Sequence, residues 1–573
     1  MLNNLKFVTE NKIANQTLTQ ISDGDICQYK LKIEFESEIS PSVFSIIWEE
    51  EQIDMYGFWC SKSHQEHNLT PNWYMRTNES KTASGMPLAC IYNKSNENRL
   101  LVALSDPASP AKIMTGVIEE NGCLHFQIDL FAQTCPKMKE YEVVIRIDRR
   151  QIPFYKAIMS ARDWWTELGY KCNYVPRESK LPMYSCWYSF HQRTIPEEII
   201  YECKIAKALG METVIVDDGW QTDDNSRGYA YCGDWRVCEK KIPDMKGFVD
   251  EIHNLGMKFM LWFSVPFIGF ESENYKRFEG KYLHTRQRMN ASVLDPRFPD
   301  VREFLVNTYC ENVKKYGYDG LKLDFIDSFQ VSEESSTNYE DMDTVSVEEG
   351  LQKLLSEAIS ELKKINPEIM IEFRQSYIGP IVSQYGNLFR VTDCPNDALF
   401  NRIGSLDLRM TSDKIPVHSD MLMWNKNDTN ESVMYQLLAT MFCVPQISVR
   451  FDNITEEHRR LLKSYLAFWR AHSDTILDGE ITMCGVDANY TMAKAKKDGQ
   501  SVSVLYENTV LTVENGEEAY AFNSTGKDGI YVETEAERKC ELYDIFGIKY
   551  GEITLAAGVS KVNLKNCEMI LIK

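Results

Sequence analysis

Alternation of apolar and polar residues marks both ends of the chain. Segments such as QYKLKIEFES, CLHFQIDLF and YEVVIRID alternate with period two and are separated by polar turns, which is typical of antiparallel sheets with one buried face. We therefore predict an N-terminal β-sandwich over residues 1–175. Similar segments near the other end, SVSVLYEN, CELYDIF and CEMILIK, predict a C-terminal antiparallel β domain over residues 476–573.

The intervening residues, 176–475, repeat a unit in which an amphipathic helix ends at a glycine and a strand begins at once. Glycine suits the left-handed conformation that closes a helix, so each one marks a helix end. The helices expected on this basis cover residues 197–209, 245–255 and 301–316 and end at Gly210, Gly256 and Gly317. Ser346 and Glu349 have the spacing of a capping box that opens a further helix. With eight strands counted here, the rhythm predicts a central (β/α)8 TIM barrel and an α/β fold class.

One strand, within GYDGLKLDFIDS at residues 317–328, places a lysine and an aspartate on the same face. Lys322 and Asp324 alternate with bulky apolar side chains, which fill the opposite face. Those apolar residues are Leu321, Leu323 and Phe325. Charged groups on the inner face of a barrel are costly to desolvate unless they pair or meet a polar ligand. The pair is therefore either an internal ion pair or part of a site.

Polar and aromatic residues recur where the expected barrel strands end, and this is where reactive residues of such barrels lie. The residues at these ends are Trp187 with Tyr188, Asp217 with Asp218 and Trp220, Trp262, Lys322 with Asp324, Glu372 with Arg374, Asp393, His418 with Asp420, and Arg450. Alternatively, each tryptophan is a core residue, and Arg374 simply forms an ion pair with Glu372. Aromatic faces near strand ends suit the C–H side of a sugar.

Two carboxylates on different strand ends are what hydrolysis of a glycosidic bond requires. Lys322 beside Asp324 favours the ionised form, which suits attack on a sugar carbon. Apolar neighbours of Asp393 are expected to raise its affinity for a proton, as an acid catalyst requires. The alternative for Asp393 is a loop aspartate that caps the turn before Pro395. In the catalytic reading, the two carboxyl groups converge across the barrel opening at roughly 5 to 5.5 Å.

Adjacent carboxylates at Asp217 and Asp218 repel each other, which suggests that they accept hydrogen bonds from the hydroxyl groups of a ligand. No glycine-rich cofactor loop, phosphate-binding loop, metal-binding helix or serine nucleophile elbow is recognisable. The nine histidines lack metal-ligand spacing. We therefore expect neither a cofactor nor a metal.

The formal net charge of −21 argues against nucleic acid or an anionic membrane as the main partner. A neutral substrate remains compatible with this charge, and the partner we expect is a small carbohydrate. The first residues lack the pattern of a secretory signal, and the longest apolar run, at 259–270, is too short to cross a bilayer. Sixteen scattered cysteines fit reduced thiols. We expect a soluble cytoplasmic protein, with a homo-oligomer left open.

Three runs together resemble the barrel of glycoside hydrolase family 36, the melibiase-like α-galactosidases and their raffinose synthase relatives. They are VDDGWQ, GDWRVCEKKIPDMKGFVDEIHNLGMKFMLWF and LDPRFPDVREFLVNTYCENVKKYGYDGLKLDF. The resemblance implies a retaining mechanism in which Asp324 is the nucleophile and Asp393 the acid/base. It implies that Asp217 and Asp218 bind the fourth and sixth hydroxyls of the sugar. The further candidates for substrate binding are Trp187, Trp220, Trp262, Lys322, Arg374, Asp397 and His418.

The chain departs from the family pattern at two places. SVPF at residues 264–267 stands where the family has Glu-Pro-Glu, and RQSYI at residues 374–378 stands where it has a Cys and a Gly-Gly-x-Arg loop at the second hydroxyl. The implied activity is hydrolysis of terminal α-linked galactose by double displacement. The alternatives are a related α-glycosidase, such as an α-N-acetylgalactosaminidase, a transglycosidase, and an inactive sugar-binding barrel.

Overall fold

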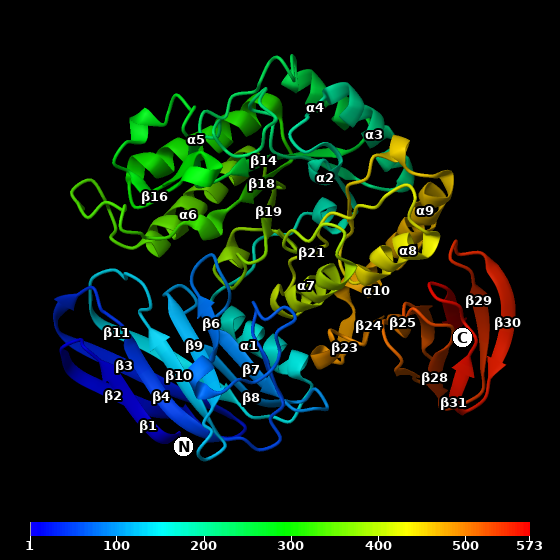
Figure 1. Cartoon of the computed structure of the whole chain (residues 1–573), viewed down its shortest axis with the longest axis horizontal. Coiled ribbons are helices and arrows are strands. Elements are labelled where there is room, and N and C mark those ends of the chain that lie inside the picture. The colour runs from blue at the N-terminus through cyan, green and yellow to red at the C-terminus, as the bar shows by residue number, and fades with distance from the viewer. Residues whose placement is uncertain (1) are drawn as a thin grey trace.

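A computed structural model of the chain describes residues 2–573, and its N-terminal part is a sandwich of two antiparallel sheets (Figure 1). The first sheet contains, in spatial order, β1 (Asn3–Thr9), β4 (Phe44–Glu51), β10 (Cys123–Leu130), β9 (Ala111–Val117) and β6 (Arg76–Ser80). The second contains β2 (Ile13–Ser22), β3 (Ile26–Ile39), β11 (Met138–Asp148), β8 (Asn98–Leu104), β7 (Leu88–Tyr92) and β5 (Gly57–Trp59). Inward-facing apolar residues of both sheets form one core, in which Trp48 stacks on Phe126 at 5.1 Å. The predicted sandwich is confirmed.

Eight parallel strands form the central barrel. In chain order they are β12 (Met183–Ser185), β13 (Thr213–Val216), β14 (Lys258–Ser264), β18 (Gly320–Asp324), β19 (Met370–Arg374), β20 (Leu388–Arg390), β21 (Val417–His418) and β22 (Gln446–Ile447). β22 pairs with β12, and backbone hydrogen bonds from Val444 to Val417 and from Ser419 to Val444 close the remaining side. The predicted (β/α)8 barrel is therefore confirmed. A small antiparallel sheet is inserted after β14 and contains β15 (Phe267–Gly269), β16 (Tyr282–Arg286) and β17 (Ala291–Leu294).

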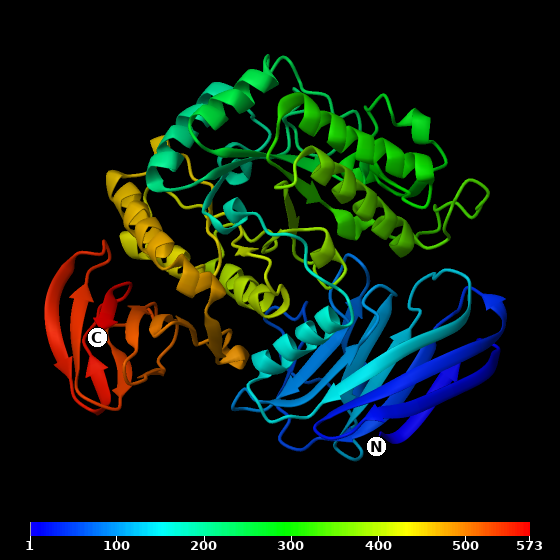
Figure 2. The ribbon, with the colours of Figure 1, turned by 180° about the vertical axis from the view of Figure 1, so that it is seen from behind.

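Helices cover the outside of the barrel (Figures 1 and 2). They are α3 (Pro196–Leu209), α4 (Met245–Asn254), α5 (Pro299–Tyr316), α6 (Val347–Ile365), α7 (Ala398–Thr411), α8 (Asn430–Ala439) and α9 (Glu456–Ala471). Three further helices are α1 (Phe154–Glu167), α2 (Trp187–Phe190) and α10 (Ser473–Asp478), of which α1 packs on both β8 and α7 and so joins the sandwich to the barrel. Gly210, Gly256 and Gly317 have φ of 100°, 73° and 80°, as expected for residues that terminate helices.

Two local predictions need correction. The Ser346 hydroxyl does accept a hydrogen bond from the Glu349 N–H, but the Glu349 carboxylate accepts from Thr344 and does not return to Ser346. Only half of the capping box forms, because the Thr344 hydroxyl stands between the other two groups. It accepts a hydrogen bond from the Ser346 N–H and donates one to the Glu349 carboxylate. Strand β18 ends at Asp324, and Phe325 has a left-handed φ of 65°, so it does not continue the outer apolar face.

Two further sheets make up the C-terminal β unit. One contains β23 (Glu480–Cys484), β24 (Met492–Lys497), β25 (Gln500–Leu505), β27 (Glu518–Asn523), β32 (Met569–Ile572), β29 (Arg538–Tyr543) and β30 (Lys549–Leu555). The other contains β26 (Val510–Val513), β28 (Ile530–Thr534) and β31 (Gly558–Val562). The unit is not purely antiparallel as predicted, because β25 pairs with β27 and β26 with β28 in parallel. Each parallel pair arises because the chain crosses to the other sheet between its two strands.

Asp407 of α7 joins all three parts of the chain. It is fully buried, and one oxygen accepts hydrogen bonds from Trp59 of the sandwich, at 3.1 Å, and from Tyr490 of the C-terminal unit, at 2.6 Å. The other oxygen has no partner among residues 2–573. Burial raises the pKa of Asp407 to about 7, although both donors oppose the shift. The sandwich and the C-terminal unit also touch directly, where Asn96 accepts from the Gly485 N–H at 2.5 Å.

We expect Asp407→Asn to make folding less sensitive to pH. A carboxyl group with a raised folded pKa binds its proton more tightly in the folded chain, so the free energy of unfolding falls as pH rises from about 4 to about 7. The loss is about 4 kcal/mol for a pKa near 7. Melting temperatures of both proteins between pH 4 and 8 test this. A wild-type curve that runs parallel to that of the variant would contradict it.

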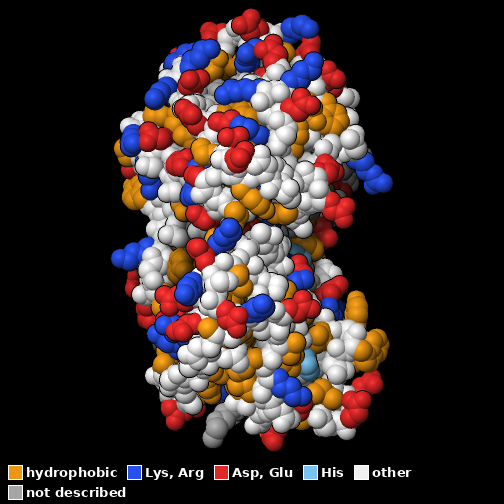
Figure 3. All heavy atoms as spheres, turned by 90° about the vertical axis from the view of Figure 1, so that its left-hand side faces the viewer, with side chains coloured by type: hydrophobic (Ala, Val, Ile, Leu, Met, Phe, Trp, Pro, Cys, Tyr) orange, Lys and Arg blue, Asp and Glu red, His pale blue; other side chains and the backbone are white. Residues whose placement is uncertain are grey.

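Within the described residues, no helix is long and apolar enough to cross a membrane. All sixteen cysteines are free thiols. No group of three or more His, Cys, Asp or Glu side chains in residues 2–573 is arranged to hold a metal ion. Acidic and basic side chains are interspersed on the face drawn in Figure 3, and they form no patch of a single sign there.

Candidate active site

Asp324 lies at the end of β18, inside the barrel mouth, with four hydrogen-bond donors around its carboxylate. Oδ1 accepts from the Arg374 Nε–H at 2.8 Å, from the Phe325 N–H at 2.9 Å, and from the Tyr377 hydroxyl. Oδ2 accepts from the Trp262 indole N–H at 3.1 Å. The residue is 5% exposed. One carboxylate oxygen is thus fully occupied, and the other keeps a free lone pair.

Lys322 lies beside this carboxylate, as the alternation of the strand predicts. Its ammonium group donates to Asp217 at 2.6 Å and lies 3.9 Å from Asp324 Oδ2. Burial by itself raises the pKa of Asp324, but the Arg374 guanidinium, the Lys322 ammonium and the Tyr377 hydroxyl outweigh it. They hold the pKa of Asp324 well below its ordinary value, so the carboxylate is ionised at neutral pH.

Asp393 follows β20 and is the more accessible of the two carboxylates, with 47% of its side chain exposed. Its Oδ1 accepts from the Arg390 guanidinium at 2.8 Å. Burial raises the pKa of Asp393, but Arg390, Arg374 and Lys322 together lower it below its ordinary value. The expectation of a raised pKa is therefore wrong, because three cations surround a group whose neighbours in sequence are apolar. Arg374 and Arg390 lower the pKa of Asp324 as well, so both carboxylates belong to one electrostatic site.

Arg390 is the centre of the buried network behind Asp393. Its guanidinium also donates to Asp420, and its Nε lies 3.4 Å from Glu372 Oε1. Asp420 in turn accepts from the Cys394 N–H at 2.7 Å, and this bond holds the loop that carries Asp393. Glu372 therefore pairs with Arg390. The alternative that it pairs with Arg374 is wrong, because the Arg374 side chain turns to Asp324.

Asp217 and Asp218, which follow β13, face different partners. Asp217 pairs with Lys322, whereas Asp218 accepts from the side-chain amides of Gln192 and Gln221, each at 2.7 Å. Burial raises the pKa of Asp218 to about 6, although both amides oppose the shift. Side chains of the protein thus already bind part of both carboxylates, which we expected to accept hydrogen bonds from sugar hydroxyls.

The three candidate tryptophans have different environments. Trp220 is fully buried, donates to the Trp262 carbonyl at 2.9 Å and stacks on Trp235, so it is a core residue and cannot offer a face to a sugar. Trp262 is buried too, but its indole N–H reaches Asp324. Trp187, on α2, is half-buried and lies beneath the Arg227 guanidinium. It is the one of the three that keeps an accessible ring.

Three other charged candidates are placed away from this cluster or have structural roles. His418 is fully buried, and its ring nitrogens lie 2.7 Å from the Ser179 carbonyl and 3.3 Å from the Gln446 amide. Burial lowers the pKa of His418 to about 4, so the prediction of substrate binding by this residue is wrong. Asp397 caps α7 through the Phe400 N–H at 2.9 Å. Arg450 pairs with acidic residues of α3 and with its near neighbour Asp452.

Sequence reasoning missed four polar residues of the site: Tyr377, Arg390, Gln192 and Tyr229, whose ring stacks on Trp262 at 6.1 Å. Arg390 had a signal, because an arginine within the apolar strand NLFRV repeats the pattern of Lys322. Tyr377, Gln192 and Tyr229 lie in loops, where no periodicity shows the direction of a side chain.

The sequence profile of the Melibiase family matches residues 185–410, which contain Asp324, Asp393 and five barrel strands, β13, β14, β18, β19 and β20. The α-galactosidase Mel36A of Lactobacillus acidophilus is 38% identical over 130 residues, 21% of this chain and 16% of that protein. The α-galactosidase AgaA of Geobacillus stearothermophilus is 32% identical over 120 residues, 20% of this chain and 16% of that protein. The matched segments thus span less than a fifth of either relative.

Solved structures extend the likeness to the whole fold. The family 36 α-galactosidase AgaB of Geobacillus stearothermophilus superposes with a TM-score of 0.64 over 100% of this chain and 81% of that chain, at 13% identity. At 13% identity the superposition establishes the architecture, including both flanking β units. The chemistry has to be inferred from the residues of the site.

Proposed function

We propose that the barrel of this chain belongs to the melibiase family of glycoside hydrolases and that the protein is a retaining exo-α-galactosidase. It releases a terminal α-linked galactose from oligosaccharides or glycosides by double displacement. The observation that carries the proposal is the state of Asp324. This carboxylate is buried, ionised and fixed by four donors, and it shares a site with the accessible Asp393.

In the proposed first step, Asp324 Oδ2 attacks the anomeric carbon of the sugar. Oδ1 is bound by Arg374, Tyr377 and the Phe325 N–H, which leaves Oδ2 as the nucleophilic oxygen. The bond between the anomeric carbon and the leaving-group oxygen breaks, and Asp393 gives that oxygen a proton. The product of this step is a galactosyl ester of Asp324.

In the proposed second step, Asp393 takes a proton from water, and the water oxygen attacks the anomeric carbon. The bond between that carbon and Asp324 Oδ2 breaks, which releases galactose and restores the Asp324 carboxylate. Asp393 must therefore hold a proton when the substrate is bound and lose it afterwards. A bound sugar covers the exposed side of Asp393, and the loss of water raises its pKa. Esterification of Asp324 then removes a negative charge that favours the protonated form of Asp393.

We further propose that Asp217, Asp218 and Lys322 bind hydroxyl groups of the galactose. Support comes from their burial at one side of the cluster, next to Asp324. Such groups favour a terminal sugar. A sugar whose hydroxyls are linked to further sugars cannot donate hydrogen bonds from them, and it would leave the buried carboxylates without partners.

One observation favours a second candidate, an α-glycosidase for a different sugar. Arg374 and Tyr377 come from residues 374–378, which replace the family loop at the second hydroxyl, and both contact Asp324 directly. They change the space next to the anomeric carbon on the side where galactose and its 2-acetamido analogue differ.

A panel of aryl α-glycosides tests the proposal and separates the two candidates. We expect kcat/KM for the α-galactoside to exceed that for the α-glucoside and the 2-acetamido analogue by at least about tenfold. A preference for the 2-acetamido analogue would support the second candidate. Absence of turnover across the panel would contradict both and favour a binding protein without catalysis. Product analysis at high acceptor concentration measures transfer against hydrolysis.

Tyr377→Phe is expected to move the acidic limb of the pH profile. The hydroxyl of Tyr377 stabilises ionised Asp324, so its removal raises the pKa of Asp324. Since attack needs the carboxylate, kcat/KM then begins to fall at a higher pH than in the wild type. Rates between pH 3 and 7 on an aryl α-galactoside measure the shift, and an unchanged or lower acidic limb would contradict the role given to Tyr377.

We also propose a reducing compartment, the cytoplasm, for this protein. Support comes from its sixteen free cysteines, several of which are buried. Cell fractionation tests this, and recovery from an oxidising compartment would contradict it.

A further inference from the structure

Two arginines at the barrel mouth lie side by side on neighbouring strands. Arg374 of β19 and Arg390 of β20 are partners in the register of the sheet, so their Cα atoms are about 4.8 Å apart. Arg374 donates to Asp324 Oδ1 at 2.8 Å. Arg390 donates to Asp393 Oδ1, also at 2.8 Å. Each carboxylate of the proposed reaction is thus held through its Oδ1 by one of two adjacent arginines.

We propose that Arg390 is the positioning residue of the acid/base and makes Asp393 Oδ2 the oxygen that transfers the proton. The inference rests on the proposed α-galactosidase mechanism and deepens it, because it assigns the proton to one atom. In the first step, the proton leaves Oδ2 for the leaving-group oxygen, which also takes the electron pair of its broken bond to the anomeric carbon. In the second step, Oδ2 takes a proton from the attacking water.

The side chain of Asp393 depends on Arg390 for its direction. The only hydrogen bond to this side chain within residues 2–573 is the one from Arg390 to Oδ1. The side chain is also 47% exposed, so packing alone does not fix it. Without the guanidinium, the carboxyl group is free to rotate about its side-chain bonds. With it, Oδ1 is occupied and Oδ2 is left for the substrate.

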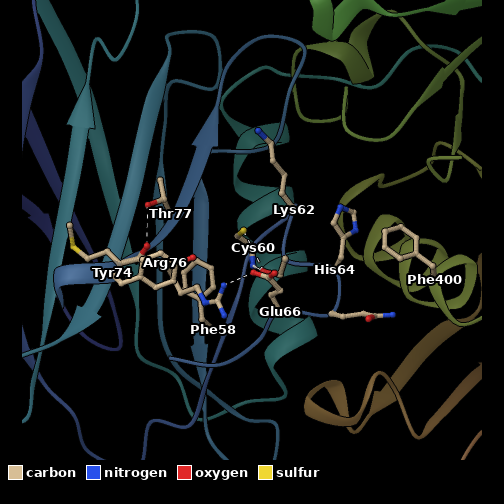
Figure 4. Close-up of a pocket in the computed structure, with 12 residues that line it drawn as sticks. Phe58, Cys60, Lys62, His64, Glu66, Tyr74, Arg76, Thr77 and Phe400 are labelled. Atoms are coloured by element: carbon tan, nitrogen blue, oxygen red, sulfur yellow. Dashed lines mark hydrogen bonds and ion pairs between the residues drawn. The ribbon is translucent and has the colours of Figure 1, made fainter. Parts of the chain in front are cut away.

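The loop that carries this carboxylate is anchored by other contacts. Its Cys394 N–H donates to Asp420 at 2.7 Å. At the far end of the loop, the Asp397 carboxylate caps α7 through the Phe400 N–H. Phe400 packs against the His64 ring of the sandwich, with 4.8 Å between the ring centroids (Figure 4). The path of the loop is thus set by these contacts, and the arginine sets the direction of one side chain.

Arg390 is rigid because its other donors are occupied or enclosed. It is fully buried, and its Nη1 donates to the Val391 carbonyl at 2.9 Å and to Asp420 Oδ1. Asp420 is fixed in turn, because its Oδ2 accepts from the Tyr188 hydroxyl at 2.9 Å. Glu372 Oε1 lies 3.4 Å from Nε. A lysine ammonium lacks the planar fork that binds two carboxylates at once, so Arg390→Lys should keep the charge and lose the positioning.

The charged and titratable groups that face Asp393 come from β18, β19, β20, α2 and the segment after β21. They are Lys322, Asp324, Arg374, Arg390, Tyr188 and Asp420. Burial raises the pKa of Asp393, and Arg390 is the strongest of the influences that lower it. In Arg390→Lys, the ammonium is expected to pair with the fully buried Asp420 and to leave Asp393. The pKa of Asp393 then rises, and the acid stays protonated to a higher pH.

Kinetics with two leaving groups test the assignment. For raffinose, whose leaving oxygen needs a proton, we expect Arg390→Lys to lower kcat/KM about 10- to 100-fold, the loss typical of a misplaced catalytic group. For 2,4-dinitrophenyl α-galactoside, we expect a loss of less than about threefold. The alkaline limb of the raffinose profile should move to higher pH. Equal losses on both substrates, or a limb that stays in place or moves lower, would overturn the inference.

A matched control and a second background complete this test. Arg302→Lys shortens another buried arginine, on α5, where it pairs with Asp343, and should change neither rate. In the Asp393→Ala background, Arg390→Lys should lower the raffinose rate by less than about twofold further, because it acts through Asp393. A further loss as large as that in the wild type would contradict the assignment.

If Arg390→Lys does not fold, Tyr188→Phe decides the question. This change removes a donor from Asp420 Oδ2, so Asp420 draws more strongly on Arg390 and weakens its hold on Asp393. We expect kcat/KM to fall about two- to fivefold on raffinose alone, and not at all in the Asp393→Ala background. No loss, or a loss shared by both substrates, would contradict the role of Arg390.

Carboxyl labelling separates failure of this inference from failure of the proposed activity. If the wild type hydrolyses neither substrate, the proposed function is contradicted, and Arg390 is then judged without catalysis. A water-soluble carbodiimide modifies protonated carboxyl groups, so the pH at which labelling of Asp393 is half-maximal, measured by mass spectrometry, reports its pKa. We expect this pH to be higher in Arg390→Lys than in the wild type. An unchanged or lower value would show that Arg390 does not control Asp393.

Discussion

Replacement of Asp324 by alanine is expected to lower kcat on an aryl α-galactoside by about 10⁵-fold, in line with the loss of a catalytic nucleophile. No other described carboxylate receives four hydrogen bonds and a neighbouring ammonium at this point of the barrel mouth. In the proposed mechanism, no galactosyl ester forms without Asp324. Steady-state rates with purified protein measure the loss.

Two controls keep this result interpretable. Removal of Asp324 leaves the Arg374 guanidinium buried without its partner, which destabilises the fold. Asp324→Asn keeps the shape and one acceptor oxygen and should be equally inactive. Asp319→Ala removes an aspartate just before the other end of β18, where it pairs with His253 and Lys258, and should keep its activity. An Asp324→Asn protein with more than about a tenth of wild-type activity would contradict the assignment.

Asp393→Ala is expected to show the second largest effect, and the effect should depend on the leaving group. For an oligosaccharide, whose oxygen leaves poorly, we expect kcat/KM to fall about 10²- to 10⁴-fold. For 2,4-dinitrophenyl α-galactoside, which needs no proton to leave, we expect a loss of less than about tenfold in kcat/KM. Paired assays on the two substrates measure the difference.

The same pair of substrates separates an acid/base role from simple binding. If Asp393 only positions the sugar or caps the turn before Pro395, its loss should affect both substrates equally. The Asp393→Ala protein should also lose the alkaline limb of its pH profile on the oligosaccharide, since that limb reports deprotonation of the acid. Retention of the limb would indicate that another group gives the proton.

Local patterns in the sequence were sufficient for the barrel and for its most important strand. The glycines that end α3, α4 and α5 have the expected left-handed conformation, and alternation places Lys322 and Asp324 together. Both features are determined by residues close together in the chain, so they can be predicted from the sequence alone. Phe325 breaks the pattern because β18 ends at Asp324 and the chain turns at the barrel mouth through a left-handed residue.

Electrostatic properties of the site could not be predicted in the same way. Asp393 has apolar neighbours in sequence, yet the pKa of its carboxyl is lowered by cations that three different strands supply. Arg374 was expected to offer a contact to the substrate or to pair with Glu372, but it binds Asp324. Such contacts join residues that are far apart in the chain, and their direction depends on rotamers that no periodicity encodes.

The loop at residues 374–378 connects these findings to specificity. Its Arg374 and Tyr377 fix Asp324 Oδ1, and its Ser376 carbonyl accepts a hydrogen bond from the sandwich through Gly85. A change in this loop therefore affects both the nucleophile and the contact between the barrel and the sandwich. The loop in which the chain departs from the family pattern is thus held by contacts with the barrel and with the sandwich.

The most direct test of double displacement through Asp324 is to trap the ester itself. The protein is incubated with an activated fluorinated galactosyl reagent that forms the intermediate but releases it slowly, and the labelled peptide is identified by mass spectrometry. We predict a single galactosyl label, on the carboxylate of Asp324. A label on another side chain, or turnover of the reagent with inversion and no labelled peptide, would contradict the mechanism.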